Sequence, residues 1–275
     1  MTKIKIASWN INSVRLRIEQ VATFAKEHAP DIITLQEIKC LEDQFPHDEC
    51  RALGYSHIEI NGQKGMHGAA TISKIPMSRI NTDFCPRGEA RHVSTRLELG
   101  GDKDFELHNF YIPAGGDEPD PKINPKFAHK LTYLDNVTNY FAGRSKENGR
   151  HVLTGDFNIA PHENDVWSHK QLLKVVSHTP VEVDKLAAMQ AAHDFTDCAR
   201  AFIDDSVKLH SWWSYRSRDI NKSDRGRRLD HIWVSPALKD AALSTGVDGH
   251  EIHRPCRFWE RPSDHAPVTQ ILDLG

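Results

Sequence analysis

The sequence has no run of eighteen consecutive apolar residues, so it offers no candidate for a transmembrane helix. It has only five cysteines in 275 residues, scattered and without a C-x-x-C pair, which argues against a disulfide framework or a zinc site. The N-terminus, MTKIKIASWN, enters a strand-like alternation directly and lacks the apolar core and cleavage site of a signal peptide. We therefore expect a protein of the reducing cytoplasm with no membrane association.

A large excess of positive charge is also missing. The formal net charge is −3, whereas a general binder of polyanions is usually basic, so nucleic-acid binding would need a local patch. Residues 215–228, YRSRDINKSDRGRR, are a candidate for such a patch, and a solvated loop is the alternative interpretation. Against Asp219 and Asp224, this segment carries six basic residues: Arg216, Arg218, Lys222, Arg225, Arg227 and Arg228.

The sequence does contain a regular succession of strand-like and helix-like segments. With 39% hydrophobic and 27% charged residues, it can form a globular protein with a sizeable core. The apolar spacing in 15–28 predicts an amphipathic helix, and a second helix is expected from Pro125, with Asn124 as its N-cap. One or two further helices are expected in 180–203. Strands are expected at 3–9, 31–36, 55–60, 68–73, 92–99, 105–112, 150–155, 229–235 and 265–272.

The order of these segments indicates the fold class. Adjacent strands without helices between them, in residues 55–112, stand beside strand–helix–strand units. This mixture predicts an α+β fold in which two packed sheets carry helices on their outer faces. Because no linker-like segment marks a boundary, we expect a single domain over residues 1–275. The Pro/Gly/Asp-rich loop at 113–125 is of a kind that often borders functional sites.

Several expected strands end in polar residues. In LTGDFNIAP, residues 153–161, the alternation puts Asp156 and Asn158 on one face and Phe157 on the other. An ordinary strand-to-turn transition is the alternative, because Asp and Asn favour turns and Pro161 supports one. The same pattern of polar residues near strand ends recurs at Asn10, Asn12, Glu37, Tyr111, Asp230, Asp264 and His265.

Most of these residues also have a structural alternative: capping for the asparagines and Asp264, a surface pair with Lys39 for Glu37, and core packing for Tyr111. Asp230 is harder to explain, since a carboxylate inside LDHIWV is costly to bury unless a metal or histidine pairs with it. As a set, the residues have the oxygen ligands that Mg²⁺ prefers. A histidine backed by a carboxylate, with Asn and Tyr nearby, would complete a site for metal-assisted hydrolysis of a phosphoester.

Six motifs, in this order and spacing, resemble the endonuclease/exonuclease/phosphatase superfamily: WNINSVR, LQEIK, FYIPAGG, GDFNIAP, RRLDHIWVS and SDHAPV. They look most like the exonuclease III type of bacterial AP endonuclease, and they span residues 7 to 268. The resemblance implies a four-layer α/β sandwich, two packed mixed β-sheets flanked by helices, with the site at one end between the sheets. It also implies a DNA-repair enzyme that uses Mg²⁺, with Mn²⁺ as the alternative ion. Its partner would be double-stranded DNA with abasic sites or 3′ ends, and we expect a monomer.

The resemblance further implies metal ligands. Glu37 would be the principal ligand of Mg²⁺, assisted by Asn10 and by Asp264 directly or through water. Asn12 stands where some members have Asp, so it would contribute weakly at the substrate side of the site.

The implied catalytic residues are Tyr111, Asp156, Asn158, Asp230 and His265. Asp156 would orient or deprotonate the attacking water, and Asn158 would hold the scissile phosphate. Asp230 would orient His265, which would contact the phosphate or share in activating the water. Tyr111 would donate to the phosphate or help the leaving group. Whether Asp156 or the Asp230–His265 pair is the general base is left open by the sequence.

Other segments resemble the substrate-binding parts of the family. Trp212, in HSWWSYRSRD, would line a pocket for an extruded sugar with Leu229 on the opposite wall, and a Trp212–Trp213 core pair is the alternative. Arg216 in the basic segment and Lys64 in GQKG would contact the DNA backbone.

Two departures from the family pattern weaken the implied preference for abasic sites. Ala114 stands where members commonly carry Asn or Gln, and Arg227 stands where some relatives have an aromatic or aliphatic residue. The alternatives to a DNA-repair nuclease are a phosphatase or RNase of the same fold, and a non-catalytic nucleic-acid-binding module.

Overall fold

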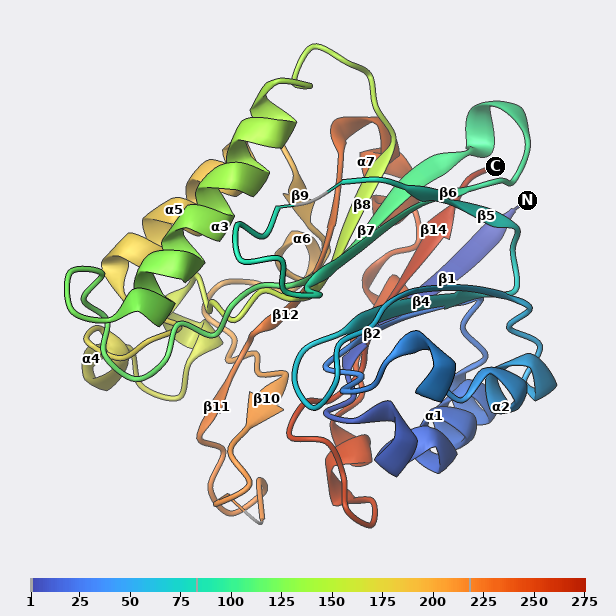
Figure 1. Ribbon diagram of the computed structural model, residues 1–275. Coiled ribbons are helices and arrows are strands. Elements are labelled where there is room, and N and C mark those ends of the chain that lie inside the picture. Colours follow the sequence, from blue (N-terminus) through green and yellow to red (C-terminus); the bar gives the residue numbers. More distant parts are fainter. Residues whose placement is uncertain (1, 83, 218) are drawn as a thin grey trace.

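The computed structural model describes residues 2–82, 84–217 and 219–275. Two six-stranded sheets pack against each other, and helices cover their outer faces, so the molecule has four layers (Figure 1). Sheet A has the strand order β13-β14-β1-β2-β4-β3. Its strands are β13 (His250–Ile252), β14 (Val268–Asp273), β1 (Lys3–Asn10), β2 (Ile32–Gln36), β4 (Ala69–Ser73) and β3 (His57–Asn61).

Sheet B has the strand order β5-β6-β7-β8-β12-β9. Its strands are β5 (Met77–Ile80), β6 (His92–Leu97), β7 (Phe105–Tyr111), β8 (His151–Asp156), β12 (Asp230–Val234) and β9 (Thr196–Asp197). β1 and β2 are parallel in sheet A, and β7 and β8 are parallel in sheet B. The carboxyl ends of each parallel pair therefore lie together at one edge of their sheet. A separate ribbon pairs β10 (Trp212–Trp213) with β11 (Gly226–Arg227).

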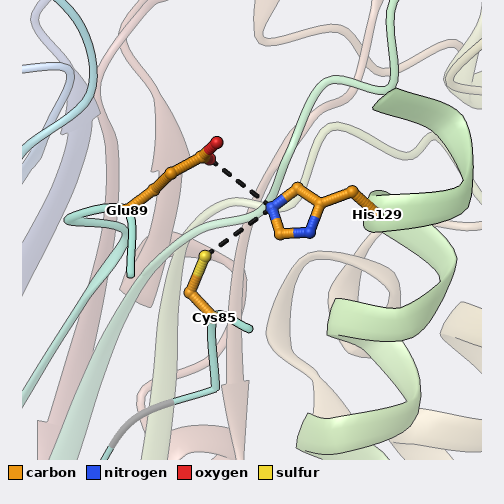
Figure 2. A group of neighbouring side chains, drawn as sticks. All are labelled: Cys85, Glu89 and His129. Carbon is orange, nitrogen blue, oxygen red and sulfur yellow. Dashed lines mark hydrogen bonds and ion pairs between the residues drawn. The ribbon is translucent and has the colours of Figure 1, made fainter. Parts of the chain in front are cut away.

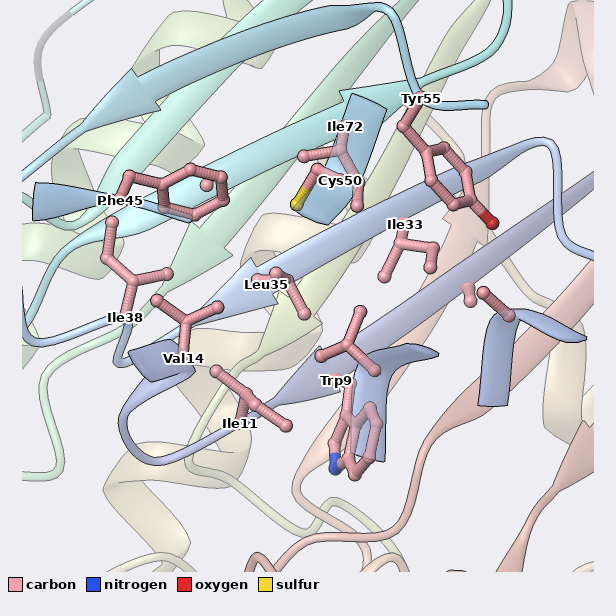
Figure 3. Close-up of a cluster of buried hydrophobic side chains, with 14 of the residues drawn as sticks. Trp9, Ile11, Val14, Ile33, Leu35, Ile38, Phe45, Cys50, Tyr55 and Ile72 are labelled. Atoms are coloured by element: carbon pink, nitrogen blue, oxygen red, sulfur yellow. The ribbon is translucent and has the colours of Figure 1, made fainter. Parts of the chain in front are cut away.

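Helices α1 (Val14–His28) and α2 (His47–Ala52) lie on the outer face of sheet A (Figure 1). Alternate strand residues face them, so that Trp9 and Leu35 lie in one buried apolar cluster with Val14 of α1 (Figure 3). The neighbouring residues of the same strands point to the other face, as a period of two requires.

Helices α3 (Pro125–Ala142) and α5 (Pro180–Ala191) cover the outer face of sheet B (Figure 1). α3 begins as the sequence predicts, because the Asn124 side chain accepts a hydrogen bond from the backbone N–H of Lys126 at 3.0 Å and Pro125 follows. The remaining short helices are α4 (His169–Leu172), α6 (Cys198–Phe202) and α7 (Pro236–Leu243). Further 3₁₀ turns lie at Glu42–Gln44, Gly101–Lys103, Glu163–Asp165, Val247–Gly249 and Arg254–Phe258. Among the described helices, none is both long and apolar enough to cross a membrane.

The interface between the two sheets combines an apolar core with a few buried polar pairs. Ile6 and Leu107, from opposite sheets, belong to the apolar part. In the polar part, the hydroxyl groups of Thr34 and Thr154 are 3.0 Å apart. The amide of Gln36 also reaches across and donates to Asn109 Oδ1 at 2.7 Å. Since a buried polar group is costly without a partner, these pairs favour one alignment of the two sheets.

This architecture confirms the predicted α+β fold, with two packed mixed sheets flanked by helices. The differences concern short elements. The last strand begins at Val268 rather than at 265, because Asp264 and Ala266 make their backbone hydrogen bonds with the β10 segment instead. Residues 180–203 divide into α5 and α6 with β9 between them. The short strands β5, β9, β10, β11 and β13 and helices α2, α4 and α7 lack a periodic pattern long enough to predict them.

Gly155 allows β8 to lie close to β7, and its substitution provides a test of this packing. Its φ is 135°, and a Cβ there would lie 1.9 Å from the carbonyl oxygen of Phe110. We expect Gly155→Ala to lower the free energy of unfolding by at least about 3 kcal/mol, measured by urea denaturation. Gly54→Ala is the matched control, since Gly54 has a φ of 93° and nothing within 4 Å of its Cβ. Backbone strain alone should then cost about 1 kcal/mol, and equal losses for the two variants would contradict the packing explanation.

Candidate active site

The predicted polar residues meet at one end of the sandwich. Asn10, Tyr111 and Asp156 are the last residues of β1, β7 and β8, and Asp230 is the first residue of β12. Asp230 and Asp156 are paired in register. Glu37 and Asn158 follow β2 and β8 with φ values of 51° and 54°, in the left-handed region. This conformation costs a non-glycine residue about 1 kcal/mol and is characteristic of functional sites.

Glu37 is held by three donors. Its Oε1 accepts hydrogen bonds from Asn10 Nδ2 at 3.0 Å and from the Tyr111 hydroxyl at 2.8 Å. Its Oε2 lies 2.9 Å from Lys39 Nζ. Burial tends to raise the pKa of Glu37, but the hydrogen bonds from Asn10 and Lys39 outweigh burial and hold the pKa below its ordinary value. The Glu37–Lys39 pair is thus part of the site rather than a separate surface pair.

Asp156 is connected to Glu37 through Asn10, whose Nδ2 also donates to Asp156 Oδ2 at 2.9 Å. Asn158 donates to Asp156 twice, from its backbone N–H at 2.9 Å and from its side-chain amide at 3.1 Å. Burial and the charge of Asp230 raise the pKa of Asp156 to about 7, against the opposing effect of His265. This carboxylate is therefore suited to accept a proton near neutral pH.

His265 and Asp230 form a buried pair beside Asp156. Nδ1 of His265 lies 2.9 Å from Asp230 Oδ2, and Nε2 lies 3.7 Å from Asp156 Oδ2. Burial lowers the pKa of His265, but the charges of Asp230 and Asp156 outweigh it and raise the pKa to about 10. The ring is therefore an imidazolium at neutral pH. Ser211 Oγ donates to Asp230 Oδ2 at 2.6 Å and fixes the carboxylate that orients the ring.

Asp264 is held by two side chains from other segments. Asn12 Nδ2 donates to its Oδ1 at 3.1 Å, and Trp212 Nε1 donates to its Oδ2 at 2.9 Å. Burial tends to raise the pKa of Asp264, but His265 and these two hydrogen bonds lower it, so the carboxylate is ionised. Trp213 is buried whereas Trp212 lines the site, so the two rings do not form a simple core pair.

A cavity of about 400 Å³ adjoins these groups. One part of its wall is apolar and includes Trp212 and Leu229. Arg227 adds a positive charge to this wall: its guanidinium carbon lies 5.3 Å from the centre of the Trp212 ring. Arg227 Nη1 also donates to Ser177 Oγ at 2.7 Å and to the carbonyl oxygen of Val176 at 2.9 Å. The polar part of the wall consists of Glu37, Tyr111, Asp117, Asp156, Asn158, Asp264 and His265, with Ser177 at its margin.

The structure thus brings most of the predicted site residues together, whereas Lys64 and Arg216 lie on exposed segments outside the cavity wall. Arg218 of the basic segment falls outside the described residues. The catalytic, metal-binding and substrate-binding roles expected for the site residues stay predictions. The residues that do gather at this end of the sandwich are Asn10, Asn12, Glu37, Tyr111, Asp156, Asn158, Trp212, Leu229, Asp230, Asp264 and His265.

The donor set fits a hard divalent cation. Three carboxylates, those of Glu37, Asp156 and Asp264, border the cavity together. Asp230 Oδ1 is buried and has no hydrogen-bond partner among the described residues. Such a concentration of buried negative charge favours a cation with oxygen ligands. Asn10 turns its amide nitrogen to the carboxylates, because its Oδ1 accepts the backbone N–H of Asn12 at 3.1 Å, so it is placed to orient Glu37.

Sequence reasoning missed two supporting residues, Lys39 and Ser211, which hold Glu37 and Asp230. Lys39 is two positions after Glu37, and this spacing suggested only a surface ion pair. Ser211 accepts the backbone N–H groups of Leu229 and Asp230, each at 3.0 Å, besides donating to the carboxylate. No local pattern marks it, since its partners are distant in the sequence.

Comparison with known proteins identifies similar chains. The model of the Endonuclease/Exonuclease/phosphatase family matches residues 7–265. Exodeoxyribonuclease III of Haemophilus influenzae is 30% identical, over 96% of this chain and 98% of the relative. A 3′ phosphatase from Neisseria, solved bound to a product DNA hairpin, superposes with a TM-score of 0.85 at 28% identity, over 98% of this chain and 99% of that one. An AP endonuclease from Archaeoglobus fulgidus gives a TM-score of 0.87 at 26% identity, covering 98% and 100% of the two chains.

Mg²⁺ should raise the melting temperature of this protein, because a cation that binds only the folded state stabilises it. At a Mg²⁺ concentration of a hundred times Kd, the free energy of unfolding rises by about 2.7 kcal/mol. For a chain of this size the melting temperature then rises by roughly 5 °C, which scanning calorimetry measures. Glu37→Gln should remove most of the rise, whereas Glu42→Gln, an exposed acid near the same strand, should keep it. An equal rise in both variants would place the ion elsewhere.

Proposed function

Since the chain belongs to the endonuclease/exonuclease/phosphatase family, we propose that it is an exonuclease III-type enzyme that cleaves DNA at abasic sites and processes 3′ ends with Mg²⁺. At the broader level the chain is a DNA-repair nuclease that hydrolyses phosphodiester bonds. The finer proposal depends on one observation above all. The carboxylates Glu37 and Asp156, from different sheets, share the Asn10 amide beside a cavity that has an aromatic wall.

Glu37 and Asp264 would hold Mg²⁺, with Asn10 and Lys39 keeping Glu37 ionised and oriented. Both carboxylates have lowered pKa values, which suits a cation that binds only the charged form. When bound, the cation supplies positive charge opposite the phosphate oxygens, and Mn²⁺ is the alternative ion.

We assign the attacking water to Asp156. Hydrogen bonds from Asn10 and Asn158 fix both carboxylate oxygens, while the side chain still borders the cavity. A carboxylate held in this way can orient a water molecule and accept its proton.

His265 and Asn158 would bind the scissile phosphate. Asp230 and Ser211 keep His265 cationic and oriented, so that its Nε2 side faces the cavity and can stabilise negative charge on the phosphate. Burial and the neighbouring charge of Glu37 keep the pKa of Tyr111 well above its ordinary value, so its hydroxyl keeps its proton. Tyr111 can therefore donate to a phosphate or leaving-group oxygen.

Double-stranded DNA is the proposed partner. Trp212 and Leu229 would contact an extruded sugar from opposite walls of the cavity. Lys64 and Arg216, which are exposed, would contact the phosphate backbone on either side, with Asn12 near the substrate. We expect the enzyme to act as a monomer in the cytoplasm, with one catalytic domain over residues 1–275.

Arg227 favours 3′-phosphate removal within this range of activities. It places a guanidinium group in the wall that Trp212 also forms, and a guanidinium binds phosphate oxygens better than it binds a neutral sugar. Ala114 lines the same cavity without offering a hydrogen-bond donor from its side chain. Arg227 therefore favours an anionic 3′ end over an abasic sugar, whereas Ala114 lacks the side-chain amide that other members could use to hold an abasic-site phosphate.

The first test uses an end-labelled duplex with one central abasic-site analogue, beside a duplex with a recessed 3′ end. We expect Mg²⁺-dependent cleavage of both, abolished by EDTA. Asp156→Asn should lower kcat at least about a thousandfold, because an amide cannot accept the proton of the water. Asp184→Asn, at an exposed position of α5, is the matched control.

The outcomes separate the candidate functions. Shortening of 3′ ends without cleavage at the abasic site would restrict the substrate to 3′ ends. Hydrolysis of inositol phosphates or RNA in place of DNA would favour a phosphatase or RNase of this fold. Binding of DNA without any hydrolysis would indicate a non-catalytic module.

A second test concerns Arg227. We expect Arg227→Leu to lower the ratio of 3′-phosphate release to abasic-site cleavage by about tenfold, since a charged hydrogen bond to phosphate is worth roughly 1.5–3 kcal/mol. Arg51→Leu, an exposed arginine of α2, should leave the ratio unchanged. A fall in both activities by the same factor would mean that Arg227 supports the cavity without selecting the substrate.

A further inference from the structure

A second group of carboxylate and histidine side chains lies at the other end of sheet B. Glu106 and His108 stand two residues apart near the start of β7, and His151 is the first residue of β8. Glu106 and His151 are register partners in the parallel β7–β8 pair. All three point to the outer face of sheet B, because residues two apart share a face and His108 packs against Phe141 of α3. At about 3.3 Å per residue, Glu106 is about 17 Å from Tyr111 along the strand.

The three side chains converge on one small volume. Glu106 Oε2 lies 3.2 Å from His151 Nδ1 and 3.7 Å from His108 Nε2, and all three atoms lie within 4.8 Å of one another. Ligand atoms about 2.0–2.2 Å from a tetrahedral metal ion are about 3.3–3.6 Å apart, so the two short separations are close to those of a zinc site.

Within the described part of the chain these three atoms have only one another as partners, since both imidazoles face Glu106 Oε2 and no other group satisfies them. They are nevertheless buried, and His108 and His151 are almost fully enclosed. Buried polar atoms without aligned partners are uncommon in folded proteins and call for an explanation such as an ion or a water. The other carboxylate oxygen of Glu106, Oε1, lies 3.5 Å from Arg144 Nη2. Oε2 is therefore the oxygen that faces the two histidines.

The surroundings also suit a metal ligand set. The other ring nitrogen of His108 lies 3.2 Å from His92 Nε2, the kind of contact that orients a metal-bound imidazole. A cavity of about 260 Å³ borders Glu106 and His151 and gives room for a water as fourth ligand.

We propose that Glu106, His108 and His151 bind one Zn²⁺ ion at a site separate from the active centre. Two imidazole nitrogens, one carboxylate oxygen and a water form a common tetrahedral set for this ion. The ion would link the N-terminal ends of β7 and β8. These two strands carry Tyr111 and Asp156 at their C-terminal ends. Its role is therefore structural support of the strands that carry the catalytic groups.

Another group, Cys85, Glu89 and His129, is less suited to a cation. His129 Nε2 lies 3.6 Å from Cys85 Sγ and 3.5 Å from Glu89 Oε2, and the ring points between the two (Figure 2). The guanidinium of Arg91 already pairs with the Glu89 oxygen that faces His129, whereas Arg144 pairs with the other oxygen of Glu106 and leaves Oε2 available to an ion. Arg91 also lies over the Tyr111 ring, at 4.8 Å from its centre, so Glu89 is already engaged in an ion pair next to the active site.

The experiment combines zinc titration with diffraction. The protein is saturated with Mg²⁺, titrated with Zn²⁺ by calorimetry, and crystallised with Zn²⁺ for anomalous scattering at the zinc edge. We expect one equivalent of Zn²⁺, an anomalous peak between Glu106, His108 and His151, and a rise in melting temperature. Glu106→Gln and His151→Gln should each weaken binding at least about tenfold, since even the loss of a residue that only orients a metal ligand costs about 10–100-fold.

Two control variants separate this site from the others. Glu37→Gln at the active centre and Cys85→Ser at the alternative group should both keep the full equivalent of Zn²⁺. Should a buried variant fail to fold, the anomalous peak of the unmodified protein still decides the position of the ion. No bound zinc, or a peak only at the active centre or beside Cys85, would overturn the proposal.

Discussion

The side-chain amide of Asn10 is the contact on which the active centre depends. Its two N–H groups donate to Glu37 and Asp156, carboxylates that belong to different sheets and would repel each other without a shared donor. The pairs formed by Gln36 with Asn109 and by Thr34 with Thr154 hold the same strands in one alignment behind it. The position of the catalytic groups is therefore set by how the two sheets pack, and the loops adjust around that arrangement.

Electrostatic differences between neighbouring carboxylates give them different tasks. Glu37 and Asp264 receive several donors and stay ionised, which suits a metal ligand. Asp156 is buried near Asp230, so its pKa is raised to about 7 and it can exchange a proton. Asp230 is committed to His265, which it keeps positively charged. Four acids of the same type are thus distinguished by their partners and burial alone.

The sequence allowed the long elements to be predicted, and it indicated most of the polar residues that the fold brings together at the candidate site. In the long strands and in α1 and α3, the hydrophobic residues repeat with a regular period over several repeats, which identifies the element. Polar residues at the ends of buried strands interrupt this period and can therefore be recognised in the sequence. Short segments such as β10 and β11 form through tertiary contacts and are too short to show a periodic pattern, so the sequence does not predict them. For the same reason Ser211 and the grouping of His151 with Glu106 and His108 were missed, because only the fold brings these partners together. Lys39 was expected only as a surface partner of Glu37.

The catalytic groups are contributed by segments from Asn10 near the start of the chain to His265 near its end. The candidate site is therefore complete only after β14 has paired with β1 and brought the segment that holds Asp264 and His265 to the ends of the other strands. Because its groups come from segments far apart in the sequence, formation of the candidate site is coupled to long-range pairing of both sheets, so a partly folded sandwich has no site.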